Sequence, residues 1–482
     1  MQLGRTIRNM ECWTALLAGV AACGQTSANG APVGDDAGPG VTQDASGGAV
    51  DASNDGWPAS PGADASLDAS FGADASRDAR FGDDAAQDAA PDAALATFVH
   101  ASGTQIVDGT GKPLILRGLG LGDWFEPEGY MWNFSGSRGD RPRRINDRIT
   151  ELIGATAAAA FWQSWYDNFI TEADVARMAE LGFNSVRLAM HYGLLLPDGQ
   201  TSFNEQGFQY LTNLVGWCSH HGIWVILDLH CAPGGQTGYN IDDSVNDTPD
   251  LFTTPANQDR LVMLWTEIAR RFAGNPTVAG YDLLNEPLQP AFTQYDAQLW
   301  PLYQRVGKSI RTVDPNHMLI VEGASWANDW TTLGAPFDGN IAYSFHKYWN
   351  DPSQASLQAY INYRTMWQAP IWLGESGENS DDWYKQVFPE CESDDIGWSF
   401  WTWKKLDGAR SGPVAGPQNN PYGIPTPAGW SAIQAYVQDA TQKPTAAAAQ
   451  ATFDQLLENI KLANCTYYSG PVCSVLGKTS CL

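Results

Sequence analysis

From about residue 97 onward, the chain alternates between two hydrophobic patterns. Short, mostly apolar runs predict buried β-strands. Between most of them, apolar residues recur every three or four positions, which predicts amphipathic helices. The expected strands are residues 114–119, 185–190, 224–230, 279–285, 318–322, 341–346, 371–375 and 397–402. The expected helices include residues 172–181, 206–221, 257–272, 297–312, 353–366 and 428–437.

Eight such alternations predict an α/β protein built as a (β/α)8 (TIM) barrel rather than an open sheet. In such a barrel the C-terminal ends of the strands converge on one face. Polar residues end the expected strands: Arg187, His230, Asn285, Glu286, Glu322, His346, Glu375 and Trp401. Buried carboxylates are costly unless they are paired, so one interpretation is a set of acids bridged to Arg187. Glu286 and Glu375 together, beside histidines and a tryptophan, favour a functional site.

The N-terminal segment has the pattern of an export signal. Arg5 and Arg8 precede an apolar stretch that is too short to span a bilayer and ends in Val-Ala-Ala-Cys at 20–23. This resembles a bacterial lipoprotein signal, in which Cys23 would be acylated and become the N-terminus. An ordinary secretory signal is the alternative. A diacylated cysteine anchors firmly, whereas one acyl chain holds only marginally.

Residues 24–94 have a composition that cannot build a core. They contain 13 Asp, two Arg and neither Glu nor Lys, with a ten-residue repeat at 62–71 and 72–81. Such a chain is solvated and repels itself, so we expect a disordered Asp/Ala/Ser/Gly-rich tether. The glycine-rich nonapeptide of calcium-binding β-rolls is absent from this stretch.

Amino-acid composition limits the classes of molecule that this protein is expected to bind. A net charge of −26 argues against nucleic acid or an anionic membrane surface as a partner. The 20 Trp suit either a sugar-stacking groove or an aromatic-rich core. Apart from Cys12 and Cys23, six cysteines remain, which in an exported protein predicts up to three disulfides. They are Cys218, Cys231, Cys391, Cys465, Cys473 and Cys481, and none forms the Cys-x-x-Cys pair of a structural zinc site.

Six short motifs occur in a recognisable order. Leu-Asn-Glu-Pro at 284–287 and Leu-Gly-Glu at 373–375 resemble the fourth- and seventh-strand signatures of glycoside hydrolase family 5. Ser-Val-Arg at 185–187, Asp-Leu-His at 228–230, Phe-His-Lys-Tyr at 345–348 and Trp-Ser-Phe-Trp at 398–401 resemble its second, third, sixth and eighth strands. The resemblance extends over residues 97–440. It implies a catalytic domain at 95–440, followed by a Cys-containing extension at 441–482.

The resemblance also implies a chemistry. In this family the seventh-strand Glu, here Glu375, is the nucleophile, and the fourth-strand Glu, here Glu286, is the acid/base of a retaining double displacement. The implied substrate contacts are Arg187, His230, Asn285, His346, Tyr348 and Trp401. Neither a metal nor a cofactor is required.

Within this family, two stretches resemble the exo-acting β-1,3-glucanases. The loop at 230–238 resembles their third-strand loop, and residues 120–127 resemble their first-strand end, in which a Glu binds the terminal sugar. That Glu would be Glu126, with Glu128 as the less favoured choice and a turn-capping acid as the alternative. Nearby aspartates at 242, 243, 247 and 250 match no EF-hand spacing, so we expect a solvated loop rather than a calcium site.

The sequence therefore predicts an exported retaining β-glycosidase acting on β-glucan, with exo-β-1,3 cleavage favoured. An endo-β-1,4-glucanase or a hydrolase of another β-glycan or glycolipid is the enzymatic alternative. A surface glycan-binding lipoprotein is the other, although it would have no use for both Glu286 and Glu375. We expect a monomer, an outer-membrane or cell-surface lipoprotein or a secreted protein, with no nucleic-acid partner and membrane attachment only through a lipid anchor.

Overall fold

The computed structural model describes residues 97–410 and 419–481. The expected signal segment, the lipidation site at Cys23 and the tether at 24–94 lie outside these residues. Between 97 and 410 and between 419 and 481, no helix is long and apolar enough to cross a membrane.

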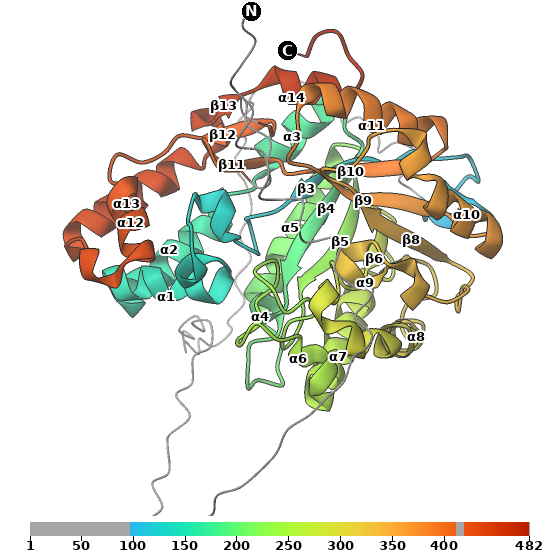
Figure 1. Ribbon diagram of the computed structural model, residues 1–482, viewed down its shortest axis with the longest axis horizontal. Helices are drawn as coiled ribbons and strands as arrows, with labels where there is room; N and C mark the ends of the chain where they lie inside the picture. Colours follow the sequence, from blue (N-terminus) through green and yellow to red (C-terminus); the bar gives the residue numbers. More distant parts are fainter. Residues whose placement is uncertain (1–96, 411–418, 482) are drawn as a thin grey trace, which may run out of the picture. The chain divides into compact units, whose positions relative to one another are not determined.

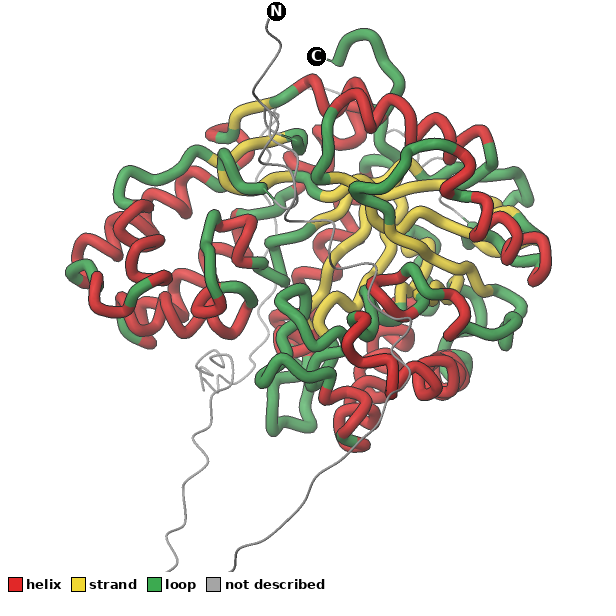
Figure 2. The backbone as a smooth tube through the Cα atoms, viewed as in Figure 1, coloured by secondary structure: helices red, strands yellow, loops and turns green. Residues whose placement is uncertain are grey.

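Eight parallel strands close into a barrel, in the order β10-β3-β4-β5-β6-β7-β8-β9. The predicted (β/α)8 barrel is thereby confirmed, and Figures 1 and 2 show the strands gathered within a ring of helices. The strands are β3 (Arg117–Leu121), β4 (Ser185–His191), β5 (Trp224–Cys231), β6 (Val278–Asp282), β7 (Met318–Glu322), β8 (Ile341–His346), β9 (Ile371–Gly377) and β10 (Gly397–Trp401).

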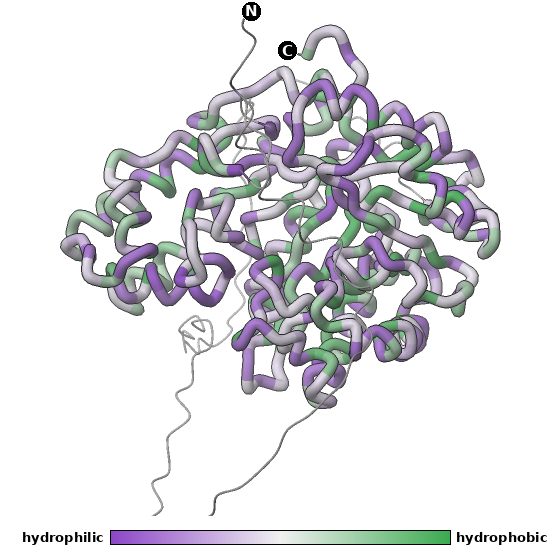
Figure 3. Tube along the Cα trace, in the orientation of Figure 1, coloured by the Kyte–Doolittle hydropathy of each residue, from purple (hydrophilic) through white to green (hydrophobic). Residues whose placement is uncertain are grey.

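These strands are continuous hydrophobic runs because both of their faces are covered. Every residue of β4, β5 and β8 is buried, as expected for a parallel sheet enclosed by helices. Figure 3 shows hydrophobic segments along the central strands. A short hairpin of β1 (His100–Ser102) and β2 (Gln105–Val107) contributes Val99 and Ile106 to the same buried cluster as the strand-start residues Trp224 and Met318. The hairpin therefore packs at the N-terminal ends of the strands and leaves the opposite ends for chemistry.

Most predicted helices are present with small shifts of their ends. The longer helices around the barrel are α3 (Glu172–Leu181), α5 (Glu205–His220), α7 (Pro255–Phe272), α8 (Asp296–Ile310), α10 (Gln358–Trp367) and α11 (Asp381–Ser393). The shorter ones are α4 (Tyr192–Leu195), α6 (Asp250–Thr253), α9 (Ala324–Ala327) and α14 (Ser469–Val475). The 3-10 turns are η2 (Gly129–Trp132), η3 (Ser137–Gly139), η4 (Pro290–Tyr295), η5 (Trp330–Thr332), η6 (Gln354–Ser356), η7 (Ala440–Gln442) and η8 (Leu462–Asn464).

A helical lobe accompanies the barrel. It comprises α1 (Pro142–Ile153), α2 (Ala155–Asn168), α12 (Trp430–Gln438) and α13 (Ala446–Asn459). The predicted helix at 428–437 therefore packs in this lobe, where the Trp430 indole donates to the Trp132 carbonyl oxygen at 3.0 Å. Fully buried tryptophans include Trp132, Trp162, Trp165, Trp265, Trp330, Trp372, Trp398, Trp403 and Trp430. Much of the tryptophan content thus serves an aromatic core, the alternative that composition left open.

The C-terminal extension is joined to the barrel by a small sheet. Strands β11 (Lys404–Leu406) and β12 (Tyr422–Ile424) pair in parallel, and β13 (Thr466–Tyr467) from the extension pairs antiparallel with β12. The ammonium group of Lys478 donates to the carbonyl oxygen of Leu181 at 2.6 Å. Residues after 440 therefore pack directly on elements of the barrel.

The described cysteines form fewer disulfides than the predicted maximum of three. Among the described residues, Cys473 and Cys481 form the one disulfide. Cys218, Cys231 and Cys391 are free and buried, and Cys465 is free and partly buried. The three buried thiols belong to separate elements, α5, β5 and α11, and they act as small apolar core residues. An even number of cysteines does not show which of them lie close together in space, and two cysteines form a disulfide only when their Cα and Cβ atoms are close enough.

Candidate active site

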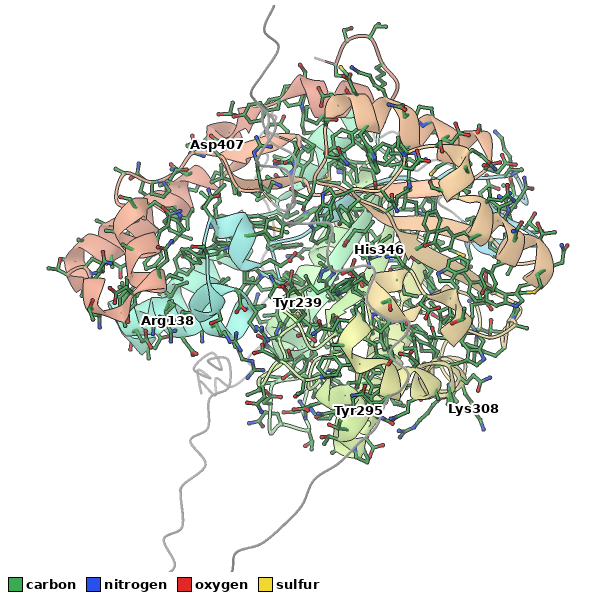
Figure 4. The ribbon with its side chains drawn as sticks, in the orientation of Figure 1. Arg138, Tyr239, Tyr295, Lys308, His346 and Asp407 are labelled. Atoms are coloured by element: carbon green, nitrogen blue, oxygen red, sulfur yellow. A yellow bond between two sulfur atoms is a disulfide. The ribbon has the colours of Figure 1, made fainter. Side chains whose placement is uncertain are left out.

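The residues singled out at the strand ends come together at the C-terminal face of the barrel. Arg187 lies in β4, His230 in β5, His346 at the end of β8, Glu375 in β9 and Trp401 at the end of β10. Asn285 and Glu286 follow β6 by a few residues, and Tyr348 follows β8. Figure 4 labels His346 among the side chains of this region.

Glu375 is held by two donors. Arg187 Nη1 donates to its Oε1 at 2.8 Å, and the Tyr348 hydroxyl donates to its Oε2 at 2.7 Å. The preceding residue must be small, because a Cβ at Gly374 would lie 2.2 Å from the Ser344 hydroxyl oxygen. The carboxylate is thus fixed in orientation and leaves 4% of the residue exposed. An oriented carboxylate with little solvation suits a nucleophile.

Glu286 sits in a different environment. Its backbone adopts φ 44°, in the left-handed region, and its N–H donates to Glu322 Oε2 at 2.6 Å. The Thr237 hydroxyl donates to its carbonyl oxygen at 2.7 Å. These bonds hold a strained backbone, which proteins retain where function requires it. The side chain is hydrogen-bonded to His346 Nδ1 at 2.6 Å.

The environment of Glu286 raises the pKa of its carboxyl group, chiefly through burial. Burial raises the pKa of Glu286, the neighbouring His346 opposes this, and the charge of Glu375 reinforces it. The pKa of His346 is itself raised well above its ordinary value, because the carboxylates of Glu322 and Glu375 outweigh its burial. The two carboxyl groups and the imidazole bring their nearest oxygen and nitrogen atoms within 4.8 Å of one another.

Arg187 is the electrostatic centre of the site. Besides Glu375, the guanidinium group contacts Asp228, Asp282 and Glu322 at 2.9–3.1 Å, and it donates to the Asn285 side-chain oxygen at 2.9 Å. Burial would lower the pKa of Arg187, but these carboxylates raise it well above its ordinary value. The interpretation of the strand-end acids as ion-pair partners of Arg187 is therefore partly correct. Several of these acids do pair with Arg187, and Glu375 is one of them.

A second group forms one wall of the site. Asp228 Oδ2 and His230 Nδ1 are hydrogen-bonded at 2.8 Å, and His230 Nε2 lies 3.2 Å from Asn285 Nδ2. The Asp228 bond favours the tautomer in which Nε2 accepts from the Asn285 amide. The imidazole of His230 stacks parallel to the Trp401 indole, with ring centroids 5.2 Å apart.

Glu126 and Glu128 occupy unequal positions. Glu126 is fully buried, and neither of its carboxylate oxygens has a hydrogen-bond partner. Glu128 is 4% exposed. Burial and neighbouring carboxylates raise the pKa of both; after burial, Glu375 and Glu286 act most strongly on Glu128, and Glu128 acts most strongly on Glu126. The two candidates for the terminal-sugar contact thus differ in burial and in the charges that act on them.

The expectation of a solvated aspartate loop was wrong for Asp242 and Asp243, which are buried, whereas Asp247 is exposed. Asp242 is buried and accepts hydrogen bonds from the backbone N–H groups of Thr237, Gly238 and Ser244. Asp243 pairs with Arg143 and His191, and Asp247 with Arg141 and Arg144. The arginines lie on or just before α1, and His191 ends β4. The loop is thus docked by ion pairs that local sequence does not reveal.

Sequence reasoning missed the aromatic side chains of the surrounding loops. Tyr239, from the loop after β5 (labelled in Figure 4), lies with its ring centroid 6.5 Å from that of Trp326, from the loop after β7. Tyr239 and Trp349 are each about half exposed. Ser325, Trp326 and Ala327 all have positive φ. Three consecutive left-handed residues that present an indole were not visible in any hydrophobic pattern.

Three sets of side chains in the described residues have the composition of metal ligands. They are Glu172–His220–His221, Glu126–Glu128–His230 and Glu286–His346–Glu375. The second and third belong to the site described above. In the third, the imidazole is already hydrogen-bonded to Glu286 and Glu322, so an acid–base assignment accounts for these groups without an ion.

Comparison with known proteins agrees with this geometry. Residues 148–407 match the family described as "Cellulase (glycosyl hydrolase family 5)". The chain therefore belongs to glycosyl hydrolase family 5, a family of enzymes that hydrolyse glycosidic bonds.

Similar proteins carry several different names. A "Beta-xylosidase" of Phanerodontia chrysosporium is 32% identical over 268 residues, 55% of this chain and 55% of that protein. "Probable glucan 1,3-beta-glucosidase A" of Emericella nidulans is 30% identical over 238 residues, 48% of this chain and 57% of that protein. The chain thus matches little more than half the length of either relative. The rutinosidase structure from Aspergillus niger shares the fold, with a TM-score of 0.51 and 18% identity over 68% of this chain and 98% of that one.

Proposed function

We propose that this chain is a retaining β-glycosidase that acts on β-glucan, with Glu375 as nucleophile and Glu286 as acid/base. The observation that carries the proposal is the pair of carboxyl groups, Glu286 and Glu375, whose facing oxygen atoms lie within 4.8 Å of each other beside His346. Retaining glycosidases hold their two carboxyl groups about 5–5.5 Å apart, whereas inverting enzymes leave room for a water between them.

The two steps use the groups as the structure arranges them. Glu375, oriented by Arg187 and Tyr348, attacks the anomeric carbon to form a glycosyl-enzyme, and protonated Glu286 donates its proton to the departing oxygen. Glu286, now a carboxylate, then accepts a proton from the water that releases the sugar. Burial and the charge of Glu375 raise the pKa of Glu286 and so keep it protonated before the first step.

The remaining predicted contacts surround the sugar in this proposal. Asn285 binds the 2-hydroxyl group, whose hydrogen bond strengthens in the transition state. His230 and His346 complete the polar wall, and Trp401 forms the floor. Because Glu126 is fully buried, we place the contact with the terminal sugar at Glu128, which is 4% exposed.

Exo cleavage of β-1,3-glucan is the preferred specificity. A carboxylate at one end of the sugar site closes it to longer chains, and a relative of this chain bears the name of a glucan 1,3-β-glucosidase. Endo-β-1,4 cleavage and hydrolysis of other β-glycans or glycolipids are the alternatives. A non-catalytic glycan-binding role is disfavoured, because it leaves the arrangement of Glu286 and Glu375 without purpose.

Product analysis tests this specificity. The full chain is incubated separately with laminarin and carboxymethyl-cellulose, and products are followed over time by chromatography. Glucose alone from laminarin, with no loss of cellulose viscosity, is the expected result. Mixed oligosaccharides from the cellulose derivative would instead establish an open endo-acting groove.

Replacing Glu128 by glutamine tests the terminal-sugar contact. Losing hydrogen bonds to a charged group costs about 1.5–3 kcal/mol, so we expect kcat/KM on laminari-oligosaccharides to fall about 10- to 100-fold. Glu180→Gln, at an exposed helix position, is the control and should leave kcat/KM unchanged. A wild-type kcat/KM in Glu128→Gln would remove Glu128 from the sugar site.

The pH profile tests the assignment of Glu286. Activity requires Glu286 to be protonated, so kcat/KM falls as pH rises through its raised pKa. Because His346 lowers that pKa, His346→Gln should move the alkaline limb of the profile to higher pH, whereas His220→Gln on the surface should not. A limb that moves to lower pH, or stays in place, would contradict the assignment.

The N-terminal sequence supports a place for the enzyme outside the cytoplasm. We propose lipidation at Cys23, with residues 24–94 as a tether to an outer membrane or cell surface, and a monomeric enzyme whose partner is the glucan. Cys23→Ser should move the protein from the membrane fraction to the soluble fraction when cells are fractionated. Membrane retention of that variant would refute lipid anchoring at this cysteine.

A further inference from the structure

Two tryptophans near the site are connected to one buried glutamate. Glu378 follows β9 with φ 50°, in the left-handed region. Its carbonyl oxygen accepts a hydrogen bond from the Trp349 indole at 3.1 Å. Its carboxylate forms an ion pair with the ammonium of Lys405, and Asn419 Nδ2 donates to Oε2 at 3.0 Å. The acid/base and nucleophile proposals make no use of this group.

A tyrosine links this glutamate to the floor of the site. The Tyr130 hydroxyl donates to Glu378 Oε1 at 3.4 Å and accepts from the Trp401 indole N–H at 2.9 Å. The ammonium group of Lys405 also lies 5.5 Å from the Tyr130 ring centroid. Lys405 and Tyr130 therefore both donate to Glu378, and Trp401 donates to Tyr130. Hydrogen bonds in such chains strengthen one another.

The other sides of the Trp401 indole are confined by packing alone. A Cβ at Gly120 or Gly122 would lie 2.4–2.5 Å from its ring atoms, so the ring rests directly against the backbone of this region. His230 stacks on it in parallel. Packing restricts tilt, but among the described residues the hydrogen-bond partner of the indole N–H is the Tyr130 hydroxyl. That bond sets the rotation of the ring within its slot.

Lys405 reaches this network because of the strand on which it lies. Alternate residues of a β-strand point to opposite faces. In β11 the neighbouring Lys404 points the other way, where its ammonium donates to Asp174 at 2.9 Å and to the Ile460 carbonyl oxygen at 2.8 Å. Lys404 thus contacts α3 and the C-terminal extension, while Lys405 on the opposite face of the strand reaches Glu378.

We propose that Lys405 and Glu378 are positioning residues, which act through Tyr130 to orient Trp401 and so set the shape of the sugar site. The inference rests on the proposed function, in which Trp401 is the floor beneath the reacting sugar. The network depends on η2 and β11, which are not among the eight barrel strands.

Three variants of the full chain test this proposal. Tyr130→Phe removes one oxygen atom, and Lys405→Met removes one charge while keeping a similar length. Because a misoriented floor weakens contact with the transition state more than with the substrate, we expect kcat to fall about 5- to 10-fold in each, with KM nearly unchanged. Lys404→Met is the matched control: it breaks the ion pair on the opposite face, so it should lower the melting temperature while retaining kcat.

The outcomes separate this inference from the proposed function. If both variants keep the wild-type kcat while Glu375→Ala is inactive, the positioning role is refuted and the catalytic assignment stands. An equal loss of kcat in Lys404→Met would refute it as well, because stability alone would then explain the effect. If the wild type cleaves no glucan, crystal structures of Tyr130→Phe and Lys405→Met decide: a rotated Trp401 indole supports the inference, and an unmoved one overturns it.

Discussion

Glu375→Ala is expected to lower turnover of the best glucan substrate by about 10⁴-fold or more, because no glycosyl-enzyme can form without the nucleophile. Glu286→Ala should cause a comparable loss with substrates that have a poor leaving group and a smaller loss with activated aryl glycosides, which need little protonation. Steady-state kinetics on both substrate types measures the difference. Circular dichroism should show an intact fold in both variants, since each removes one side chain at the end of a strand.

Rescue by azide separates the two roles further. In Glu375→Ala, azide occupies the space of the missing carboxylate and attacks the intact substrate directly, so the glycosyl azide has an inverted anomeric centre. In Glu286→Ala, azide attacks the glycosyl-enzyme and the product keeps the substrate configuration. Identical products from the two variants, or wild-type turnover in either, would overturn the assignment.

Arg187→Met is expected to have the second-largest effect, on stability and activity together. The guanidinium group is fully buried among Asp228, Asp282, Glu322 and Glu375. Removing one partner of a buried ion pair typically costs about 3–5 kcal/mol, because the remaining charges stay buried without compensation. We expect a loss of this size in the free energy of unfolding, measured by urea denaturation. Turnover should also fall by about 100-fold or more, since Glu375 loses an orienting donor.

A surface arginine supplies the control for this experiment. Arg270 is paired with Glu267 on the exposed side of α7, and exposed pairs contribute about 0–1 kcal/mol. Arg270→Met should therefore leave both the unfolding free energy and turnover close to wild type. If Arg187→Met were equally mild, the charge cluster would not have the central role that its geometry indicates.

The barrel strands were predictable because their signal is local. In a parallel sheet with both faces covered, each strand is a continuous apolar run. Six of the eight predicted runs begin at the first residue of the strand in the structure and end within two residues of its last. The helical lobe was harder to predict from the sequence. Helix α2 begins with an alanine-rich stretch that carries weak periodicity, and the burial of α12 against Trp132 depends on residues almost 300 positions away.

The residues of the candidate site likewise fall into those that the sequence predicted and those that it did not. Arg187, Glu286 and Glu375 were predictable from the sequence, because a charged residue at the end of an apolar strand is costly to bury unless it is paired. Glu378, Lys405 and Tyr130 gave no such signal, since an acid in a turn, a lysine in a short strand and a tyrosine near a glycine are common anywhere. Their importance comes from the three residues meeting beside one indole.

By itself, the sequence determined which residues are able to carry the chemistry, because the period of the strands places alternate side chains inward and the strand ends on one face. Only the tertiary structure determines how deeply each of these residues is buried and which charged groups it contacts. Burial separates Glu126 from Glu128, and four buried carboxylates share one arginine. Ion pairs with α1 and β4 dock an aspartate loop that composition alone describes as solvated. These effects depend on the distances between charges and on their exclusion from water, which arise only when segments far apart in the chain are brought together.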